Sequence, residues 1–127
     1  MSNEIIQMLA ALLGVTGIIF GAFGAHALKK IFDTEQLTSF EVGVRYQIYH
    51  ALFLLFISMN DSITCVHRDW LVYLVFVGVL MFSGSIYVLN LSKLGSNKFK
   101  FLWPVTPIGG MLLIISWFLV AFSAFCK

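Results

Sequence analysis

The chain has 127 residues, of which 60% are hydrophobic and only 11% are charged, and its mean hydropathy is +0.94. A water-soluble domain carries about a quarter charged residues, so this composition excludes one and indicates a protein whose main solvent is lipid. The formal charge of +2 comes without a basic run interleaved with aromatic residues, which excludes a nucleic-acid partner.

Four apolar segments follow one another along the chain, and each is long enough for a bilayer crossing of about 20 residues. They cover residues 5–27, 37–59, 71–91 and 105–125. The sequence therefore predicts an all-α membrane protein, an up-down bundle of four transmembrane helices forming a single domain over residues 1–127.

Capping residues predict where two of these helices begin. The second helix has two candidate starts, a capping box at Thr38 and Glu41 or an earlier cap at Asp33. In the fourth helix we expect Thr106 to be the cap and Pro107 to take the first helical position, where a missing N–H costs nothing.

The distribution of Lys and Arg predicts the orientation in the membrane. Six of the eight fall in or beside the first and third loops, and two lie on the other side. Because these residues concentrate in cytoplasmic loops, we expect both termini outside the cytoplasm, in a bacterial inner membrane. The six are Lys29, Lys30, Arg45, Lys93, Lys98 and Lys100, and the two are Arg68 and Lys127.

The two cysteines, Cys65 and Cys126, lack the spacing of a zinc or CxxC redox motif. Both would lie at the outer face, which is an oxidising compartment in a bacterium. The sequence leaves open whether they form a disulfide, and it predicts no metal site and no cofactor.

A stripe of small residues runs along the first segment, with steps of four and three that give the 3.5-residue period of a left-handed seam. Membrane helices associate by close backbone approach at such residues. The stripe predicts packing inside the bundle or, alternatively, self-association of two copies through its four glycines. Its members are Ala10, Gly14, Gly17, Gly21 and Gly24, and the fourth segment repeats the pattern more weakly with Gly109, Ser116 and Ser123.

Polar side chains in membrane helices are costly, so each one is a candidate for a site. Alternating helix direction brings the candidates to one depth, and we expect a connected cluster with His50 near its middle. Since an imidazole in hydrocarbon would leave a donor and an acceptor unpaired, His50 should turn inward and bond to Tyr87, Asn90, Thr106 or His26 on another helix. The candidate binding residues are His26, Arg45, Tyr46, Tyr49, His50, Tyr87, Asn90 and Thr106.

Two interpretations of these residues stay open. In the structural one, Arg45 extends to the headgroups and pairs with Glu41, the tyrosines anchor the interface and the histidines bond across helices. In the functional one, they and the free N–H groups of the fourth helix form a pocket for a lipid headgroup or a partner's membrane segment. No Asp or Glu lies inside a crossing to serve as an acid or base, so the sequence predicts no enzyme and no catalytic residue.

Four short segments stand out in order along nearly the whole chain: GAFGAHAL at 21–28, RYQIYHAL at 45–52, GSIY at 84–87 and TPIGG at 106–110. Together they resemble the YgdD-like family of small membrane proteins, a domain of unknown function (DUF 423) whose eukaryotic relative is transmembrane protein 256. The resemblance implies a four-helix protein of the bacterial inner membrane with no established activity.

The function that fits these observations is that of a non-enzymatic accessory or interaction subunit. It would bind the lipid bilayer and either a larger membrane protein complex or anionic lipid. The alternative is a small transporter or channel. That alternative needs a polar path across the bilayer, and the outer half of the four segments is nearly bare of polar residues.

Overall fold

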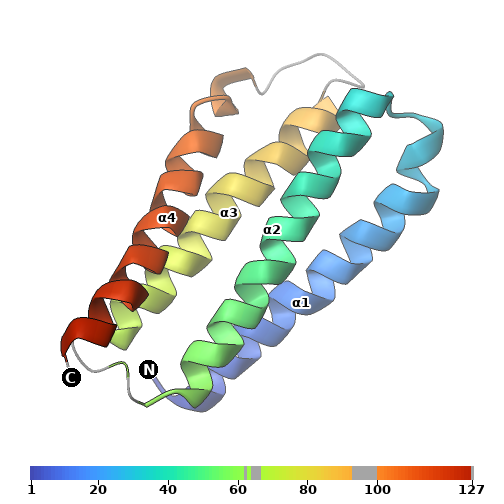
Figure 1. Cartoon of the computed structure of the whole chain (residues 1–127). Coiled ribbons are helices and arrows are strands. Elements are labelled where there is room, and N and C mark those ends of the chain that lie inside the picture. The colour runs from blue at the N-terminus through green and yellow to red at the C-terminus, as the bar shows by residue number, and fades with distance from the viewer. Residues whose placement is uncertain (62, 64–66, 93–99, 127) are drawn as a thin grey trace.

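The computed structural model describes residues 1–127 except 62, 64–66, 93–99 and 127. All four helices are long and apolar enough to cross a membrane, which confirms the predicted up-down bundle (Figure 1). Cys65, Lys93, Lys98 and Lys127 lie outside the described residues. The helices are α1 (Asn3–His26), α2 (Thr34–Met59), α3 (Arg68–Ser92) and α4 (Val105–Ser123), and the 3₁₀ turns are η1 (Leu28–Lys30), η2 (Lys100–Leu102) and η3 (Ala124–Cys126).

The four helices pack in chain order, with α1 against α2, α2 against α3 and α3 against α4 (Figure 1). The apolar stretches of α2 and α3 are 50% and 44% buried, whereas those of α1 and α4 are only 22% buried. The bundle is therefore an open row with α2 and α3 in the middle. We call the end where α1 finishes and α2 begins the basic end, because Lys29, Lys30 and Lys100 lie there.

The structure corrects one predicted helix start and decides another. α2 begins at the earlier position, because the Asp33 carboxylate accepts from the Gln36 N–H and the Gln36 side chain accepts from the Asp33 N–H. Thr38 instead donates to a carbonyl of its own helix. α4 begins at Val105 with Pro104 as its cap, so the predicted cap at Thr106 is wrong.

Apolar packing fills the half of the bundle opposite the basic end. Ile6, Leu54, Ile57, Leu71 and Val72, from three different helices, are each 0% exposed there. A smaller apolar cluster, which includes Phe40 and Tyr87, lies toward the basic end. The half of the interior away from the basic end is thus the more apolar half.

Three glycines of the α1 stripe lie against α2. A Cβ at Gly17 would come within 2.9 Å of Ile48, one at Gly21 within 3.3 Å of Val44, and one at Gly24 within 3.1 Å of Phe40. Gly14 has nothing within 4 Å of that position. Three of the four glycines in the stripe therefore pack against α2 inside the bundle. Gly14 is the one with free space beside it, and self-association of two copies stays a prediction.

Among the described glycines, Gly109 of α4 has the least room for a side chain. A Cβ there would lie 2.4 Å from the Phe82 backbone nitrogen and 2.9 Å from the Gly78 carbonyl oxygen, both on α3. Backbone atoms cannot move aside as a flexible side chain can. Only glycine therefore fits at this crossing, and the contact fixes how α3 and α4 meet.

We expect Gly109→Ala to destabilise the protein, because the added methyl group would push α4 away from the α3 backbone. Overpacking of this kind costs about 1–3 kcal/mol. The matched control is Gly110→Ala, since a Cβ at Gly110 meets only the Phe82 ring at an ordinary 3.6 Å. The measurement is the unfolding midpoint in detergent, and equal midpoints for the two variants would contradict the proposed crossing.

Candidate functional site

His50 is buried and takes part in two hydrogen bonds. Its Nδ1 is 2.7 Å from the Tyr46 carbonyl oxygen, and the indole N–H of Trp117 on α4 donates to its Nε2 over 3.1 Å. A carbonyl only accepts and an indole N–H only donates, so His50 is the neutral tautomer with its proton on Nδ1. The side chain turns inward as expected, but its partner is Trp117, which the sequence analysis did not consider.

Gln47 is the centre of the polar interior, although it was not among the predicted site residues. Its side-chain amide donates to the Leu13 carbonyl over 2.9 Å and to the Thr16 hydroxyl over 2.7 Å, and its Oε1 accepts from the Tyr87 hydroxyl over 2.7 Å. One buried amide on α2 therefore joins α1 to α3. The sequence could have predicted that Gln47 is buried, because it shares a helix face with Phe40, one of the apolar residues of α2.

Asn90 and Ser83 make further contacts between α2 and α3. The Asn90 amide donates to the Ser39 hydroxyl over 3.0 Å, and the Ser83 hydroxyl donates to the Gly43 carbonyl over 2.6 Å. Thr106 at the start of α4 shares a short hydrogen bond with Ser85 of α3. Four of the predicted residues, His50, Tyr87, Asn90 and Thr106, thus link helices to one another.

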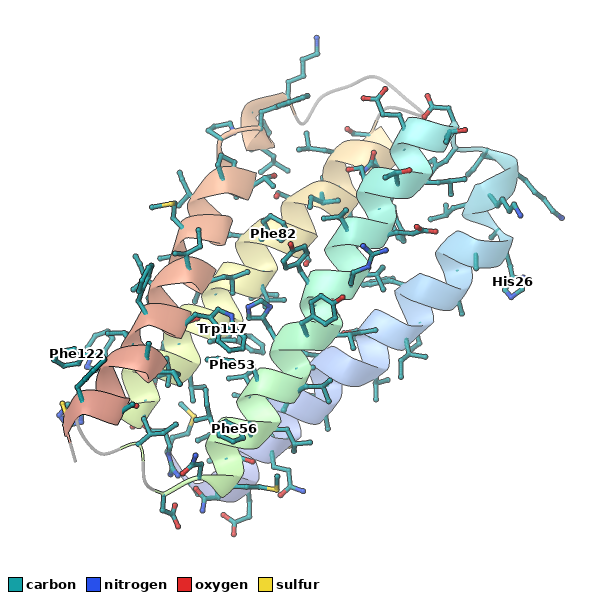
Figure 2. All side chains as sticks on the ribbon, viewed as in Figure 1. His26, Phe53, Phe56, Phe82, Trp117 and Phe122 are labelled. Atoms are coloured by element: carbon teal, nitrogen blue, oxygen red, sulfur yellow. The ribbon has the colours of Figure 1, made fainter. Side chains whose placement is uncertain are left out.

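The other four predicted residues lie on the surface. Arg45, Tyr46 and Tyr49 are exposed on α2, and Figure 2 shows His26 on the outer side of α1, pointing away from the other helices. The expected single cluster around His50 is wrong, since the described contacts form separate groups. The ion pair between Arg45 and Glu41 is also absent, although both residues are described.

Every buried side-chain nitrogen and oxygen of the described residues has a hydrogen-bond partner. In the same residues, no group of three or more His, Cys, Asp and Glu could hold a metal ion. The buried polar groups are therefore all paired within the chain, some across helices and others, such as Ser116, to a carbonyl of their own helix. The open spaces that the structure offers to a ligand are the clefts between helices.

A cleft of about 400 Å³ opens at the basic end between α2, α3 and α4. Two predicted site residues, Asn90 and Thr106, lie in its wall beside the half-buried Ser39 of α2 and the exposed Trp103. No side chain caps the N-terminus of α4 at this cleft, and its first turn contains no acidic residue. We call it the basic-end cleft; it is lined by Ser39, Ile86, Leu89, Asn90, Trp103, Thr106 and Pro107.

Comparison with known proteins places the chain in a family. The DUF423 family, described as a protein of unknown function, matches residues 20–110. The chain belongs to the DUF423 family. A UPF0382 membrane protein of Staphylococcus aureus is 37% identical over 93% of both chains, and the UPF0382 membrane protein YwdK of Bacillus subtilis is 31% identical over 95% of this chain and 96% of its own length. No solved structure matches the chain.

The DUF423 match covers much of the polar interior. Gln47, Tyr87, Asn90 and Thr106 all lie inside residues 20–110, whereas Trp117 lies beyond them. The relatives are named as bacterial membrane proteins, in agreement with the four apolar helices. The family match therefore supports a membrane protein of unknown function and names no chemistry.

We expect Gln47→Leu and Tyr87→Phe to weaken the fold through the same lost contact, because each removes one partner of the 2.7 Å hydrogen bond between α2 and α3. Hydrogen bonds between membrane helices average about 0.6 kcal/mol and reach about 1.7. A double-mutant cycle followed by unfolding in detergent should give a coupling energy in that range. Pairing Gln47→Leu with Ser123→Ala is the control, because the Ser123 hydroxyl bonds only to its own helix. A coupling energy of zero in both cycles would rule out a stabilising role for the contact.

Proposed function

We propose that this protein is a non-enzymatic accessory protein of the bacterial inner membrane that binds an anionic lipid headgroup in the basic-end cleft. The observation that carries the proposal is the cleft itself, an open space of about 400 Å³ at the uncapped N-terminus of α4. A partner's membrane segment is the competing occupant.

The first turn of α4 offers hydrogen-bond donors to an anion. The Ile108 N–H bonds to the Pro104 carbonyl, and no side chain caps the start of the helix. The backbone N–H groups of a helix's first turn and the positive end of its dipole favour a phosphate at such a position. The exposed Lys100 of η2, three residues before Trp103, adds positive charge on the same side.

A phosphate also suits the depth of the cleft. Phospholipid headgroups lie at the membrane interface, where amphipathic aromatic side chains such as that of Trp103 are enriched. The wall of the cleft is mostly apolar, with Ile86 and Leu89 beside Asn90 and Thr106. A molecule with an anionic group and a hydrocarbon part could contact both the polar and the apolar residues of this wall.

Two features support binding over catalysis or transport. The buried polar atoms of the described residues are all paired within the chain, so none of them is left unpaired in the interior. The interior away from the basic end is lined by apolar residues such as Leu54, Leu71 and Val75, each 0% exposed. A transporter or channel needs polar groups across the whole depth, so these features favour an accessory protein.

The first prediction concerns stability in lipids of different charge. Reconstitution in phosphatidylcholine with added phosphatidylglycerol should raise the unfolding midpoint above that in phosphatidylcholine alone, because a ligand that binds only the folded state stabilises it. Pro107→Glu should abolish this rise, since its carboxylate would occupy the first turn of α4 and repel an anionic headgroup. An acidic residue there stabilises a helix by about 0.3–1 kcal/mol, so the variant should still fold.

The control is Pro107→Gln, which makes the same change without the charge and should keep the response to phosphatidylglycerol. An unchanged midpoint of the natural protein in the two lipids would contradict lipid binding and leave a partner's membrane segment as the occupant. An equal response of the two variants would contradict the assignment to this cleft.

The second prediction concerns orientation. The six-to-two bias of Lys and Arg toward the first and third loops leads us to propose that the basic end faces the cytoplasm. A reporter fused after Lys127 that is active only outside the cytoplasm should then be active. A reporter placed in the segment 93–99 is the control and should be inactive. The reverse pattern of the two activities would overturn the orientation.

A further inference from the structure

A second cleft follows α2 and α4 away from the basic end. It has a volume of about 370 Å³, and aromatic side chains make most of its wall (Figure 2). Phe56 and Trp117 are each 51% exposed, so their rings face outward into the cleft and the surroundings. We call it the α2–α4 groove; it is lined by Tyr49, Leu52, Phe53, Phe56, Trp117 and Val120.

The groove continues the line of the basic-end cleft. Both lie between α2 and α4, one with Ser39 and Thr106 in its wall and the other with Phe53 and Trp117. Figure 2 shows Phe82, Trp117, Phe53 and Phe56 one below another in the gap between these two helices. Between the two clefts, the Phe82 ring lies against Gly110 of α4 and the Tyr46 ring of α2, so these two residues flank the way from one cleft to the other.

The width of the groove limits what can lie in it. At its floor Trp117 reaches from α4 to α2, with its ring centroid 4.2 Å from that of Phe53 and its N–H on His50. Single side chains therefore bridge the two helices, and a third helix, about 10–12 Å across, cannot enter between them. A single hydrocarbon chain is narrow enough to lie over these rings.

The length of the path agrees with one lipid leaflet. From Thr106 to Trp117 the path follows α4 for three turns, which is about 16 Å at about 1.5 Å per residue. Half of a hydrocarbon core of about 30 Å is about 15 Å. A lipid whose headgroup lies in the basic-end cleft would thus bring the end of its acyl chain to Trp117.

We propose that the α2–α4 groove holds one acyl chain of a bound anionic phospholipid. The inference rests on the proposed function, because the headgroup of the same lipid would occupy the basic-end cleft. The hydrogen bond from Trp117 to His50 then has a second role. It holds the indole in place as the floor of the groove and directs its only polar group inward, leaving an apolar surface for the chain.

Tryptophan fluorescence can test this, because the chain has three Trp residues in three different places. A variant with Trp70→Phe and Trp103→Phe retains Trp117 in the groove, and one with Trp103→Phe and Trp117→Phe retains Trp70 at the start of α3. Each is reconstituted in phosphatidylcholine vesicles with a minor fraction of a lipid brominated near the ends of its acyl chains. The brominated lipid is either phosphatidylglycerol or phosphatidylcholine, and the bromines quench a neighbouring indole.

We expect brominated phosphatidylglycerol to quench Trp117 more strongly than the same fraction of brominated phosphatidylcholine, because a bound lipid is enriched over its fraction in the vesicle. The two lipids should quench Trp70 equally. Val120→Phe, which fills the groove, should remove the difference at Trp117, whereas Ile115→Phe, on an exposed position outside the groove, should keep it.

Three results would overturn the proposal. Equal quenching of Trp117 by both lipids would show ordinary surrounding lipid in the groove. Persistence of the preference in Val120→Phe would place the chain elsewhere. A third result would be a loss of Trp117 quenching as the ratio of protein to lipid rises, with Trp70 quenching unchanged. It would show that a second copy of the protein covers the groove. If phosphatidylglycerol still raises the unfolding midpoint in these cases, the headgroup site stands and only the groove fails; if it does not, both fail.

Discussion

Close backbone approach at glycine is the constraint on which this bundle depends. Lipid tails are as apolar as leucine, so membrane helices gain little from hiding apolar side chains from their surroundings. They associate where their surfaces fit closely, and here each pair of neighbouring helices meets at glycine. Gly17, Gly21 and Gly24 serve α1 and α2, Gly43 lies against Tyr87 between α2 and α3, and Gly109 meets Gly78 between α3 and α4. The polar groups can form short hydrogen bonds between helices because these contacts first bring the helices together.

The polar groups then divide the interior along its depth. Gln47, Ser83, Tyr87 and Asn90 join helices in the middle of the bundle and toward the basic end, whereas the other half is packed with aliphatic residues. Gln47 shows why these hydrogen-bonded polar groups are stable in an apolar interior. Both of its amide hydrogens and its oxygen are bonded, and a buried polar group costs free energy chiefly when it is left unpaired.

The helices could be predicted from the sequence because membrane crossing depends on length and hydropathy, which are properties of each segment alone. Packing partners depend on rotation and tilt, which hydropathy does not encode. His50 was correctly expected to face inward, since the cost of an unpaired imidazole is local, but its partner Trp117 follows from how α4 crosses α2. Trp117 is 51% exposed while its N–H points inward, so one side chain serves both the surface and a contact between helices.

The start of α4 likewise differs from what local sequence rules predict. Thr106 and Pro107 satisfy the usual rules for a cap and a first position, yet the helix begins two residues earlier than Pro107. Pro107 causes no loss there, because the first four N–H groups of a helix have no partner within it. The Thr106 hydroxyl is then free of capping and bonds to Ser85 on α3. A residue that local rules assign to a cap thus serves a contact between helices.

The open row of helices leaves parts of the two middle helices, α2 and α3, uncovered at the surface. A closed four-helix bundle would bring α1 against α4 and cover both sides of α2 and α3. Here α1 and α4 stay apart, and each forms its main contacts with one neighbour. Among the gaps that remain are those between α2 and α4 along one face and at the basic end, where the surrounding membrane reaches the middle helices. The buried polar atoms of the described residues are already paired, and the proposed lipid site therefore uses the aromatic and backbone groups that line those gaps.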